Sequence, residues 1–280
     1  MERLSQQIKL LAIDIDGTLL NPVKQITPRT LEAVRAAQQA GIIVTLATAR
    51  RYRNTLPIAD TLGIDIPLVL CDGAMIMEHP HGKVLTTHLL EAEVAQQAVE
   101  LLVRHKVQPV VHHINGQIEE TWTGDTQLDN EWLAMYFTSF ADTMQRMEYE
   151  TLCTGHPDPL RVVAFASEKQ IYGLIPEIST LACSWNAVRS GNYGSAELAI
   201  LHQTCSKATG VTTLAKLLDI PLEQIMAIGD NHNDLEMLQA VGWGVAMGQA
   251  PDEVKAVAHA VTASNQEDGV ALAIETYALC

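Results

Sequence analysis

Two aspartates separated by one residue follow a short apolar run near the start of the chain. Asp14 and Asp16 come directly after residues 10–13, and Gly17-Thr18 follows them. Because strand residues alternate between faces, side chains at positions i and i+2 point to the same side. We expect both carboxylates in one crevice at the carboxyl end of a buried strand, where open α/β sheets carry their chemistry. Such carboxylates repel each other unless a cation or a proton lies between them. A solvated Asp-Gly turn is the plainer alternative.

Three further segments place reactive groups at the ends of predicted elements. Thr48 follows the apolar run 43–47, Lys207 opens a predicted helix, and Asp230 and Asp234 flank a turn after the run 225–228. Each has an ordinary structural interpretation: Thr48 as a helix cap, Lys207 as a surface lysine, and the two aspartates as an Asx-rich turn. A lysine at a helix start opposes the helix dipole, and a bound anion would offset that effect.

Alternating strands and helices surround these groups at both ends of the chain. In the first seventy residues, a Thr-Pro pair predicts a helix start at 27–28 and a glycine predicts its end at 41. The amino-terminal part predicts strands at 10–13, 42–47 and 67–70, with helices at 28–40 and up to 62. The carboxyl-terminal part predicts strands at 197–201, 225–228, 244–245 and near 261, with helices from 206, at 234–240, at 251–258 and from 268. This alternation is typical of a parallel, right-handed α/β sheet.

The middle of the chain has a different pattern. We expect a hairpin at 75–85, helices from 91 and at 169–181, and strands at 107–112, 117–120, 149–152, 161–166 and 184–189. This order is typical of an α+β domain. The sequence therefore predicts an α/β protein with a doubly wound, parallel-sheet (Rossmann-like) core. Residues 1–83 and 192–280 form the discontinuous core, and residues 84–191 form an inserted α+β domain.

Composition narrows the class of protein. The 280 residues are 48% hydrophobic, enough for a full core, and 18 basic against 33 acidic residues give a formal charge of −15. This charge argues against nucleic acid or an anionic membrane as a partner. Five scattered cysteines are typical of reduced thiols, and neither a signal peptide nor a run long enough to span a bilayer is apparent. We expect a cytoplasmic protein, a monomer or a homodimer.

The order of these motifs resembles a known family. Asp-x-Asp-Gly-Thr, a downstream Thr, a lone Lys and Gly-Asp-x-x-Asn-Asp resemble the four motifs of the haloacid dehalogenase-type phosphatases, over essentially the whole chain. The inserted domain resembles the class IIB cap of Cof-type phosphatases. The chain departs from the common pattern at Ala49 and Ala208, where glycine is usual, and at Asp72, where Asn is usual. The added negative charge of Asp72 near the cap hinge bears on substrate preference more than on the reaction.

The resemblance implies a role for each residue. Asp14 is the expected nucleophile, forming an aspartyl-phosphate, and Asp16 the general acid and base. The Asp14 carboxylate, the Asp16 backbone carbonyl and Asp230 are expected to hold Mg²⁺, with Asn231 near the outer shell. The remaining roles are phosphate binding and orientation of Lys207 or a metal-bound water. The expected phosphate-binding groups are Lys207, Thr48, Asn233 and the N–H groups of Ile15 and Ala49, and the expected orienting residue is Asp234.

The implied activity is an Mg²⁺-dependent phosphatase acting on a small phosphorylated metabolite, a sugar phosphate or similar. Two alternatives stay open: a phosphohexomutase, which shares the aspartate pair and the cap class, and a non-catalytic regulator that binds a phosphorylated metabolite. A nucleotide-binding dehydrogenase is disfavoured because no Gly-x-Gly-x-x-Gly follows the first strand. Candidate substrate contacts are Arg50, His113, Trp122 and Arg161, although Arg50 fits an exposed helix position at least as well, and Trp122 fits a core position better than one that stacks on a sugar.

Overall fold

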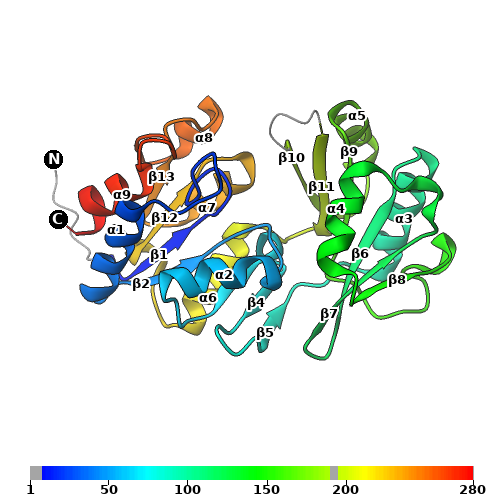
Figure 1. Ribbon diagram of the computed structural model, residues 1–280, viewed down its shortest axis with the longest axis horizontal. Helices are drawn as coiled ribbons and strands as arrows, with labels where there is room; N and C mark the ends of the chain where they lie inside the picture. Colours follow the sequence, from blue (N-terminus) through cyan, green and yellow to red (C-terminus); the bar gives the residue numbers. More distant parts are fainter. Residues whose placement is uncertain (1–7, 190–194, 280) are drawn as a thin grey trace. The chain divides into compact units, whose positions relative to one another are not determined.

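The computed structural model describes residues 8–189 and 195–279. The chain divides into two compact units. The core unit contains Met1–Thr86 and Ser206–Cys280, and the inserted unit contains Thr87–Cys205. In Figure 1 the two segments of the core unit are coloured blue to cyan and yellow to red, and the inserted unit between them is mainly green. The division between Thr86 and Thr87 lies close to the expected boundary at 83/84. The division between Cys205 and Ser206 lies well beyond the expected boundary at 191/192.

The core unit is built on a five-stranded parallel sheet in the order β14-β13-β12-β1-β2. Its strands are β1 (Leu10–Ile13), β2 (Ile43–Leu46), β12 (Ile225–Gly229), β13 (Trp243–Ala246) and β14 (Ala260–Val261). A second sheet contains β3 (Leu68–Leu70), β4 (Met75–Met77) and β5 (Val84–Thr87), in that order. A parallel bridge between Ala47 and Val69 links the two sheets. Every residue of β1 is buried, as expected for a central parallel strand.

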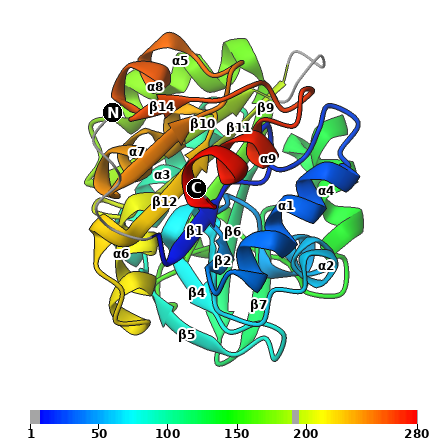
Figure 2. The same ribbon diagram turned by 90° about the vertical axis from the view of Figure 1, so that its left-hand side faces the viewer.

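Helices cover both faces of the parallel sheet, so the expected doubly wound arrangement is confirmed. Figure 2 shows α1 and α9 on one face and α6 and α7 on the other. The helices of the core unit are α1 (Pro28–Gln39), α2 (Tyr52–Leu62), α6 (Lys207–Leu217), α7 (Leu235–Ala240), α8 (Asp252–Val257) and α9 (Gly269–Ala273). The predicted start of α1 is present, because the Thr27 side chain accepts a hydrogen bond from the Thr30 N–H and Pro28 comes first.

The inserted unit contains a six-stranded mixed sheet in the order β10-β11-β9-β6-β7-β8. Its strands are β6 (Pro109–Asn115), β7 (Ile118–Thr123), β8 (Met144–Arg146), β9 (Arg161–Ser167), β10 (Cys183–Arg189) and β11 (Ser195–His202). Helices α3 (Ala92–Arg104) and α5 (Glu168–Ile178) pack in its hydrophobic core. Helix α4 (Glu131–Phe140) contacts β9. The strand expected at 149–152 is wrong, since Tyr149–Thr151 forms a single 3₁₀ turn.

The second expected domain boundary is wrong because of β11. The sequence prediction assigned residues 197–201 to the core, where a strand followed by a helix resembles one more βα unit. In the structure β11 is antiparallel to both of its neighbours, with Ala196 opposite Arg189 on β10 and Ala166 on β9. An apolar strand buried on both sides carries no local signal of the sheet it joins. The inserted unit therefore extends to Cys205.

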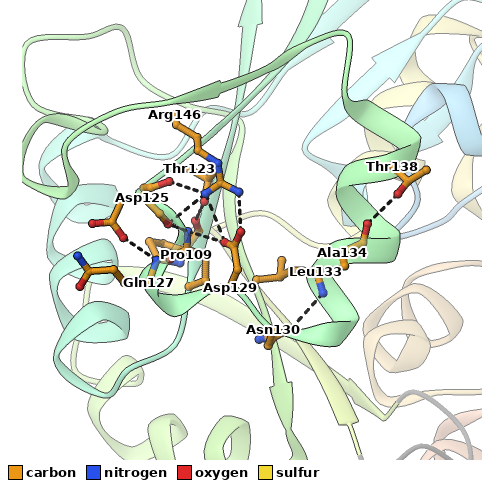
Figure 3. Close-up of polar contacts among 12 residues, drawn as sticks. Pro109, Thr123, Asp125, Gln127, Asp129, Asn130, Leu133, Ala134, Thr138 and Arg146 are labelled. Carbon is orange, nitrogen blue, oxygen red and sulfur yellow. Dashed lines mark hydrogen bonds and ion pairs between the residues drawn. The ribbon is translucent and has the colours of Figure 1, made fainter.

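A network of polar contacts holds the segment before α4 in the inserted unit (Figure 3). Arg146 donates to an Asp129 carboxylate oxygen at 2.6 Å and to the carbonyl oxygens of Gly124 and Asp125 at 2.7 and 3.0 Å. Asn130 then caps α4 by accepting a hydrogen bond from the Leu133 N–H. One guanidinium thus satisfies a carboxylate and two carbonyl groups, which fixes the turn from which α4 starts.

Of the helices in the described ranges, none combines the length and the apolar character needed to cross a membrane. Among the described residues, Cys71, Cys153, Cys183 and Cys205 are thiols and not disulfide-bonded.

Candidate active site

The parallel register of the core sheet brings three of the predicted acidic groups to one edge. Ile13 of β1 lies opposite Ile228 of β12, and the Asp14 N–H donates to the Ile228 carbonyl at 3.0 Å. Asp14 and Asp230 therefore leave adjacent strands at nearly the same level. Asp14, Asp230 and Asp234 each offer a carboxylate oxygen, and these oxygens lie within 4.8 Å of one another. Aspartates more than 200 positions apart in the sequence thus form one acidic cluster.

A buried lysine lies between two of these carboxylates. The Lys207 ammonium is 1% exposed and donates to Asp14 Oδ1 and to Asp234 Oδ1, each at 2.6 Å. The other oxygen of Asp234 accepts the backbone N–H groups of Asp230 and Asn231, at 2.9 and 3.0 Å. Asp234 is therefore fully engaged within the protein. It fixes both the lysine and the turn that carries Asp230.

The acidic groups of this cluster are more costly to ionise than ordinary carboxyls. Burial, reinforced by the neighbouring charge of Asp234, raises the pKa of Asp14 well above its usual value, although Lys207 acts in the opposite direction. The same two causes raise the pKa of Asp230 to about 6. Burial would by itself lower the pKa of Lys207, but the charges of Asp14, Asp234 and Asp72 raise it above its ordinary value. The cluster is thus short of positive charge.

The space beside Asp230 depends on a glycine. Gly17 has a φ of +88°, and a Cβ atom built on it would lie 2.3 Å from Asp230 Oδ2. The neighbouring Thr18 hydroxyl donates to Asp230 Oδ1 at 2.9 Å. The turn after β1 therefore approaches the carboxylate closely and orients it. The carboxylates of Asp14 and Asp230 are hard oxygen ligands of the kind that Mg²⁺ prefers, so the residues present fit this ion.

Asp16 has different partners from Asp14. Arg50 pairs with both of its oxygens, with Nε 2.6 Å from Oδ2 and Nη2 2.8 Å from Oδ1, and Lys24 Nζ lies 2.9 Å from Oδ1. Although burial raises the pKa of Asp16, the hydrogen bonds and charges of Arg50 and Lys24 lower it to about 2. Asp16 is half-exposed and ionised, while Asp14 is buried. Arg50 precedes α2, so the expected exposed helix position is wrong.

The predicted phosphate-binding residues lie in the turns around this edge. Thr48 is buried, and its hydroxyl accepts the Arg50 N–H at 3.2 Å. The Asn233 amide donates to Asp72 Oδ1 at 3.0 Å. The Asn231 side chain accepts the His232 N–H at 2.8 Å, which makes it the cap of a short turn. Ile15 is the second residue after the end of β1. Ala49 lies two residues before Arg51, which caps α2.

The whole-chain comparison decides the family. A family model described as haloacid dehalogenase-like hydrolase matches residues 11–274, which covers both units. The chain belongs to this family. The first and last motifs of the resemblance, around Asp14 and Asp230, both lie inside the matched range.

Similar proteins of this hydrolase family are named as phosphatases. The chain is 28% identical over 280 residues to the pyridoxal phosphate phosphatase YbhA of Escherichia coli, covering 94% of this chain and 96% of that protein. It is 28% identical over 274 residues to the 5-amino-6-(5-phospho-D-ribitylamino)uracil phosphatase YitU of Bacillus subtilis, covering 96% and 97%. A solved HAD subclass IIB sugar phosphatase, BT4131, has a TM-score of 0.77 at 25% identity, covering 97% of this chain and 100% of that one. Together with the family match, these relatives support a phosphatase.

Two residues of the candidate site, Thr18 and Lys24, have no role in the sequence prediction, and Asp72 is linked there only to substrate preference. Thr18 orients Asp230, Lys24 pairs with Asp16, and Asp72 accepts the Asn233 amide. Thr18 belongs to the first motif and lies two residues after Asp16, so the sequence alone could have indicated that it belongs to the site. The contacts of Lys24 and Asp72 depend on loop conformations, since both have positive φ angles of 61° and 55°.

The candidate substrate contacts in the inserted unit do not form one group. His113 and Trp122 contact each other, with ring centroids 3.9 Å apart, and Trp122 packs against the hydrophobic core. Arg161 lies opposite His112 in the sheet register and donates from Nε to His112 Nδ1 at 3.1 Å. Because His112 and His113 are consecutive on β6, they point to opposite faces of the sheet. His113 and Arg161 thus do not share one face. Because Trp122 packs against the hydrophobic core, its interpretation as a core residue is the better one.

Proposed function

We propose that this protein is an Mg²⁺-dependent phosphatase that hydrolyses a small phosphorylated metabolite, a sugar phosphate or a similar monoester, through an aspartyl-phosphate on Asp14. The observation that carries the proposal is the buried Asp14 carboxylate, bonded to a buried Lys207 and within 4.8 Å of Asp230 and Asp234. A protein with a purely structural need would gain little from three clustered carboxylates, because burying unpaired charge is unfavourable.

The metal would be held by the carboxylates of Asp14 and Asp230 together with the backbone carbonyl of Asp16. Its charge would offset the acidic cluster and draw electron density from the phosphoryl group. The closeness of Gly17 to Asp230 and the raised pKa values of Asp14 and Asp230 support a cation at this position. Asn231 is a weaker candidate, since its side-chain oxygen already accepts a backbone N–H.

The protein's own groups would perform the two half-reactions. In the first, an Asp14 oxygen attacks phosphorus, the ester P–O bond breaks, and protonated Asp16 gives its proton to the leaving oxygen. In the second, ionised Asp16 takes a proton from the water that attacks the aspartyl-phosphate, which releases Asp14 and inorganic phosphate. The Arg50 and Lys24 pairs favour the ionised form of Asp16, so the first half-reaction requires that these pairs loosen.

The transferred group would be held by fixed donors. Lys207 supplies a charge, Thr48 a hydroxyl, and Ile15 and Ala49 backbone N–H groups, with Asn233 contributing its amide. Asp234 would keep Lys207 in position, as its hydrogen bond to the ammonium suggests. We assign the inserted unit the role of a cap that selects the substrate, and we propose a cytoplasmic monomer or homodimer.

The deciding experiment is release of inorganic phosphate from a panel of esters by wild type and Asp14→Asn, with and without Mg²⁺. The panel includes sugar phosphates, pyridoxal phosphate and a phosphorylated ribitylaminouracil, the classes named in similar proteins. We expect Mg²⁺-dependent hydrolysis that Asp14→Asn abolishes. Hydrolysis indifferent to that substitution overturns the role of Asp14. Isomerisation of a hexose phosphate that requires a hexose bisphosphate identifies a mutase instead, and tight binding without either reaction identifies a regulator.

A further inference from the structure

Two side-chain amides from the carboxyl-terminal part of the chain hold the turn that follows β1. Gln249, three residues after β13, donates from Nε2 to the Gly17 carbonyl oxygen at 2.6 Å. Asn265, four residues after β14, donates from Nδ2 to the Leu20 carbonyl oxygen at 2.8 Å. The Asn265 backbone N–H in turn donates to Gln249 Oε1 at 3.1 Å. The loops after β13 and β14 therefore bind the turn after β1 at two of its carbonyl groups.

The loop that carries Gln249 is itself fixed to the core unit. The Met247 N–H donates to the Gly229 carbonyl oxygen at 2.9 Å, and the Gly248 N–H donates to the Ala263 carbonyl oxygen at 3.0 Å. A Cβ atom built on Gly248 would lie 2.9 Å from the carbonyl carbon of Ala263, so the two loops pack backbone against backbone. Gln249 is exposed, and ordering a long exposed side chain costs conformational entropy. Its amide uses both its oxygen and its nitrogen within the protein, which offsets this cost.

Gly17 is the residue of the turn that most needs such a restraint. Its φ of +88° and the 2.3 Å that would separate a Cβ atom from Asp230 Oδ2 both require glycine here. Glycine also has the widest range of backbone conformations, so the close approach to Asp230 leaves the turn free to change. Rotation about the Gly17 backbone bonds moves the Asp16 carbonyl group on one side and Thr18 on the other. A hydrogen bond to the Gly17 carbonyl oxygen removes much of this freedom.

Both neighbours of Gly17 belong to the proposed metal site. The Asp16 carbonyl oxygen is one of its ligands, and the Thr18 hydroxyl orients the Asp230 carboxylate at 2.9 Å. We propose that Gln249, supported by Asn265, is a positioning residue that holds the turn after β1 in the conformation that Mg²⁺ binding requires. This inference rests on the proposed function and assigns to it a residue that touches neither the metal ligands' side chains nor the phosphate donors within the described contacts.

The choice between two metal ions reports on such positioning. Mg²⁺ demands nearly ideal octahedral geometry, whereas Ca²⁺ accepts irregular and variable coordination. A turn that has lost its restraint should therefore weaken the binding of Mg²⁺ more than that of Ca²⁺. A general loss of stability would instead weaken the binding of both ions alike, because it leaves the geometry of the folded site unchanged.

The test is calorimetric titration of the metal-free protein with Mg²⁺ and, separately, with Ca²⁺. Gln249→Met keeps the length of the side chain but removes both hydrogen bonds of the amide. We expect the Kd for Mg²⁺ to rise roughly tenfold, as for other groups that orient metal ligands, and the Kd for Ca²⁺ to rise much less. The matched control is Gln38→Met. Gln38 Nε2 also donates to a carbonyl oxygen of the core unit, that of Leu62 at 3.1 Å, and its loss should leave both affinities unchanged.

A double-mutant cycle with Thr18→Val locates the effect. Valine has nearly the shape of threonine but lacks the hydroxyl that orients Asp230. If Gln249 acts through the turn, both substitutions loosen the same structure, and their effects on the free energy of Mg²⁺ binding should sum to less than the separate losses. Fully additive effects would show that Gln249 does not act through this turn, which contradicts the proposal.

Unchanged Mg²⁺ binding by folded Gln249→Met, or equal weakening of Mg²⁺ and Ca²⁺ binding, overturns the proposal. Gln249→Ala is the second variant and should show the same preference for Ca²⁺ over Mg²⁺ relative to wild type. If neither variant folds, the glutamine is a structural requirement of the core unit and the proposal is wrong. The wild type tests the proposed function separately. A wild type that binds no Mg²⁺ removes the metal site itself, whereas Mg²⁺ binding that the variants share removes only the role of Gln249.

Discussion

The core unit and the inserted unit each hold a cluster of charged side chains, but the core cluster is largely buried, whereas the pair of Arg146 and Asp129 in the inserted unit is 28–29% exposed. At the edge of the core sheet, Asp14, Asp230 and Asp234 crowd around the ammonium of Lys207, and negative charge is in excess. In the inserted unit, Arg146 meets one carboxylate and two carbonyl groups, so its charge is matched.

This contrast separates a site from architecture. Buried charge without a partner is unfavourable and is retained where an ion or a substrate arrives to offset it. Matched polar groups stabilise the fold and need no ligand. The excess of negative charge, more than the number of polar residues, is therefore what supports the core edge as the proposed site.

Asp14→Asn should have the largest effect. Loss of the proposed nucleophile is expected to lower kcat by about 10³-fold or more, as for residues known to form a covalent intermediate. Without Mg²⁺, the same variant should unfold at a higher temperature than wild type, because one ionisable acid leaves an overcrowded cluster. Phosphate release and thermal unfolding in the presence of a chelator measure both effects. If the variant kept its activity, Asp14 would not be the nucleophile. If it were less stable than wild type without metal, the core edge would not carry an excess of negative charge.

Arg146→Met tests the matched network of the inserted unit. It leaves the Asp129 carboxylate and two carbonyl groups without their donor, and we expect a loss of about 2 kcal/mol in the stability of this unit. Hydrogen exchange of the inserted unit reports the change. The control is Arg29→Met, which removes an exposed pair with Glu275 in the core unit and should have a smaller effect on hydrogen exchange of that unit. Equal effects of the two variants would show that the network adds nothing beyond a surface ion pair.

The metal-free core unit should lose stability as pH rises. The pKa of Asp230 is raised from 3.8 to about 6, and that of Asp14 is raised in the same direction. A raised pKa means that the folded state binds more protons, so this contribution is present below pH 3.8 and is lost as pH rises through about 6. Allowing for partial exposure of Asp230, we expect a fall of about 1–2 kcal/mol.

Mg²⁺ should reverse this trend. In the proposed site the ion would bind ionised carboxylates, so its addition should raise the unfolding temperature more at pH 7 than at pH 4.5. Asp16 does not obscure the measurement, because its pKa is lowered to about 2 and its contribution is lost only below the range studied. Thermal unfolding with a chelator or with Mg²⁺, at several pH values, gives the result. Stabilisation by Mg²⁺ that is independent of pH would contradict a site made of these carboxylates.

The sequence predicted those parts of the structure that have local signals. The apolar runs before Asp14 and Asp230 gave the strands of the core sheet, and parallel pairing then brought the two acids together. The sheet joined by β11 was not predictable, since its apolar residues fit either unit. The pairing of Asp16 with Arg50 and Lys24, and of Asp72 with Asn233, depends on loop backbones whose φ angles the sequence does not reveal.

The smallest expected effect concerns His113. Its contribution to stability falls on acidification, whereas that of the acidic cluster rises. Burial, with the nearby charge of His156, lowers the pKa of His113 from 6.5 to about 4. A base whose pKa is lowered by folding contributes its full stability at pH values above its pKa in the unfolded state. It loses that contribution as pH falls from 6.5 towards 4. The inserted unit should therefore weaken on acidification, over much of the range in which the metal-free core unit strengthens.

His113→Phe isolates this contribution. Within the described residues His113 Nε2 has no hydrogen-bond partner, and a phenyl ring keeps the contact with Trp122, so the change at pH 7 should stay within about 1 kcal/mol. Below pH 6 the variant should be more stable than wild type, because phenylalanine takes up no proton. Hydrogen exchange of β6 between pH 7 and 4.5, corrected for the intrinsic rate, measures the difference. A pH slope identical to that of wild type would mean that His113 does not respond to acid, and the opposition between the two units would then rest on the acidic cluster alone.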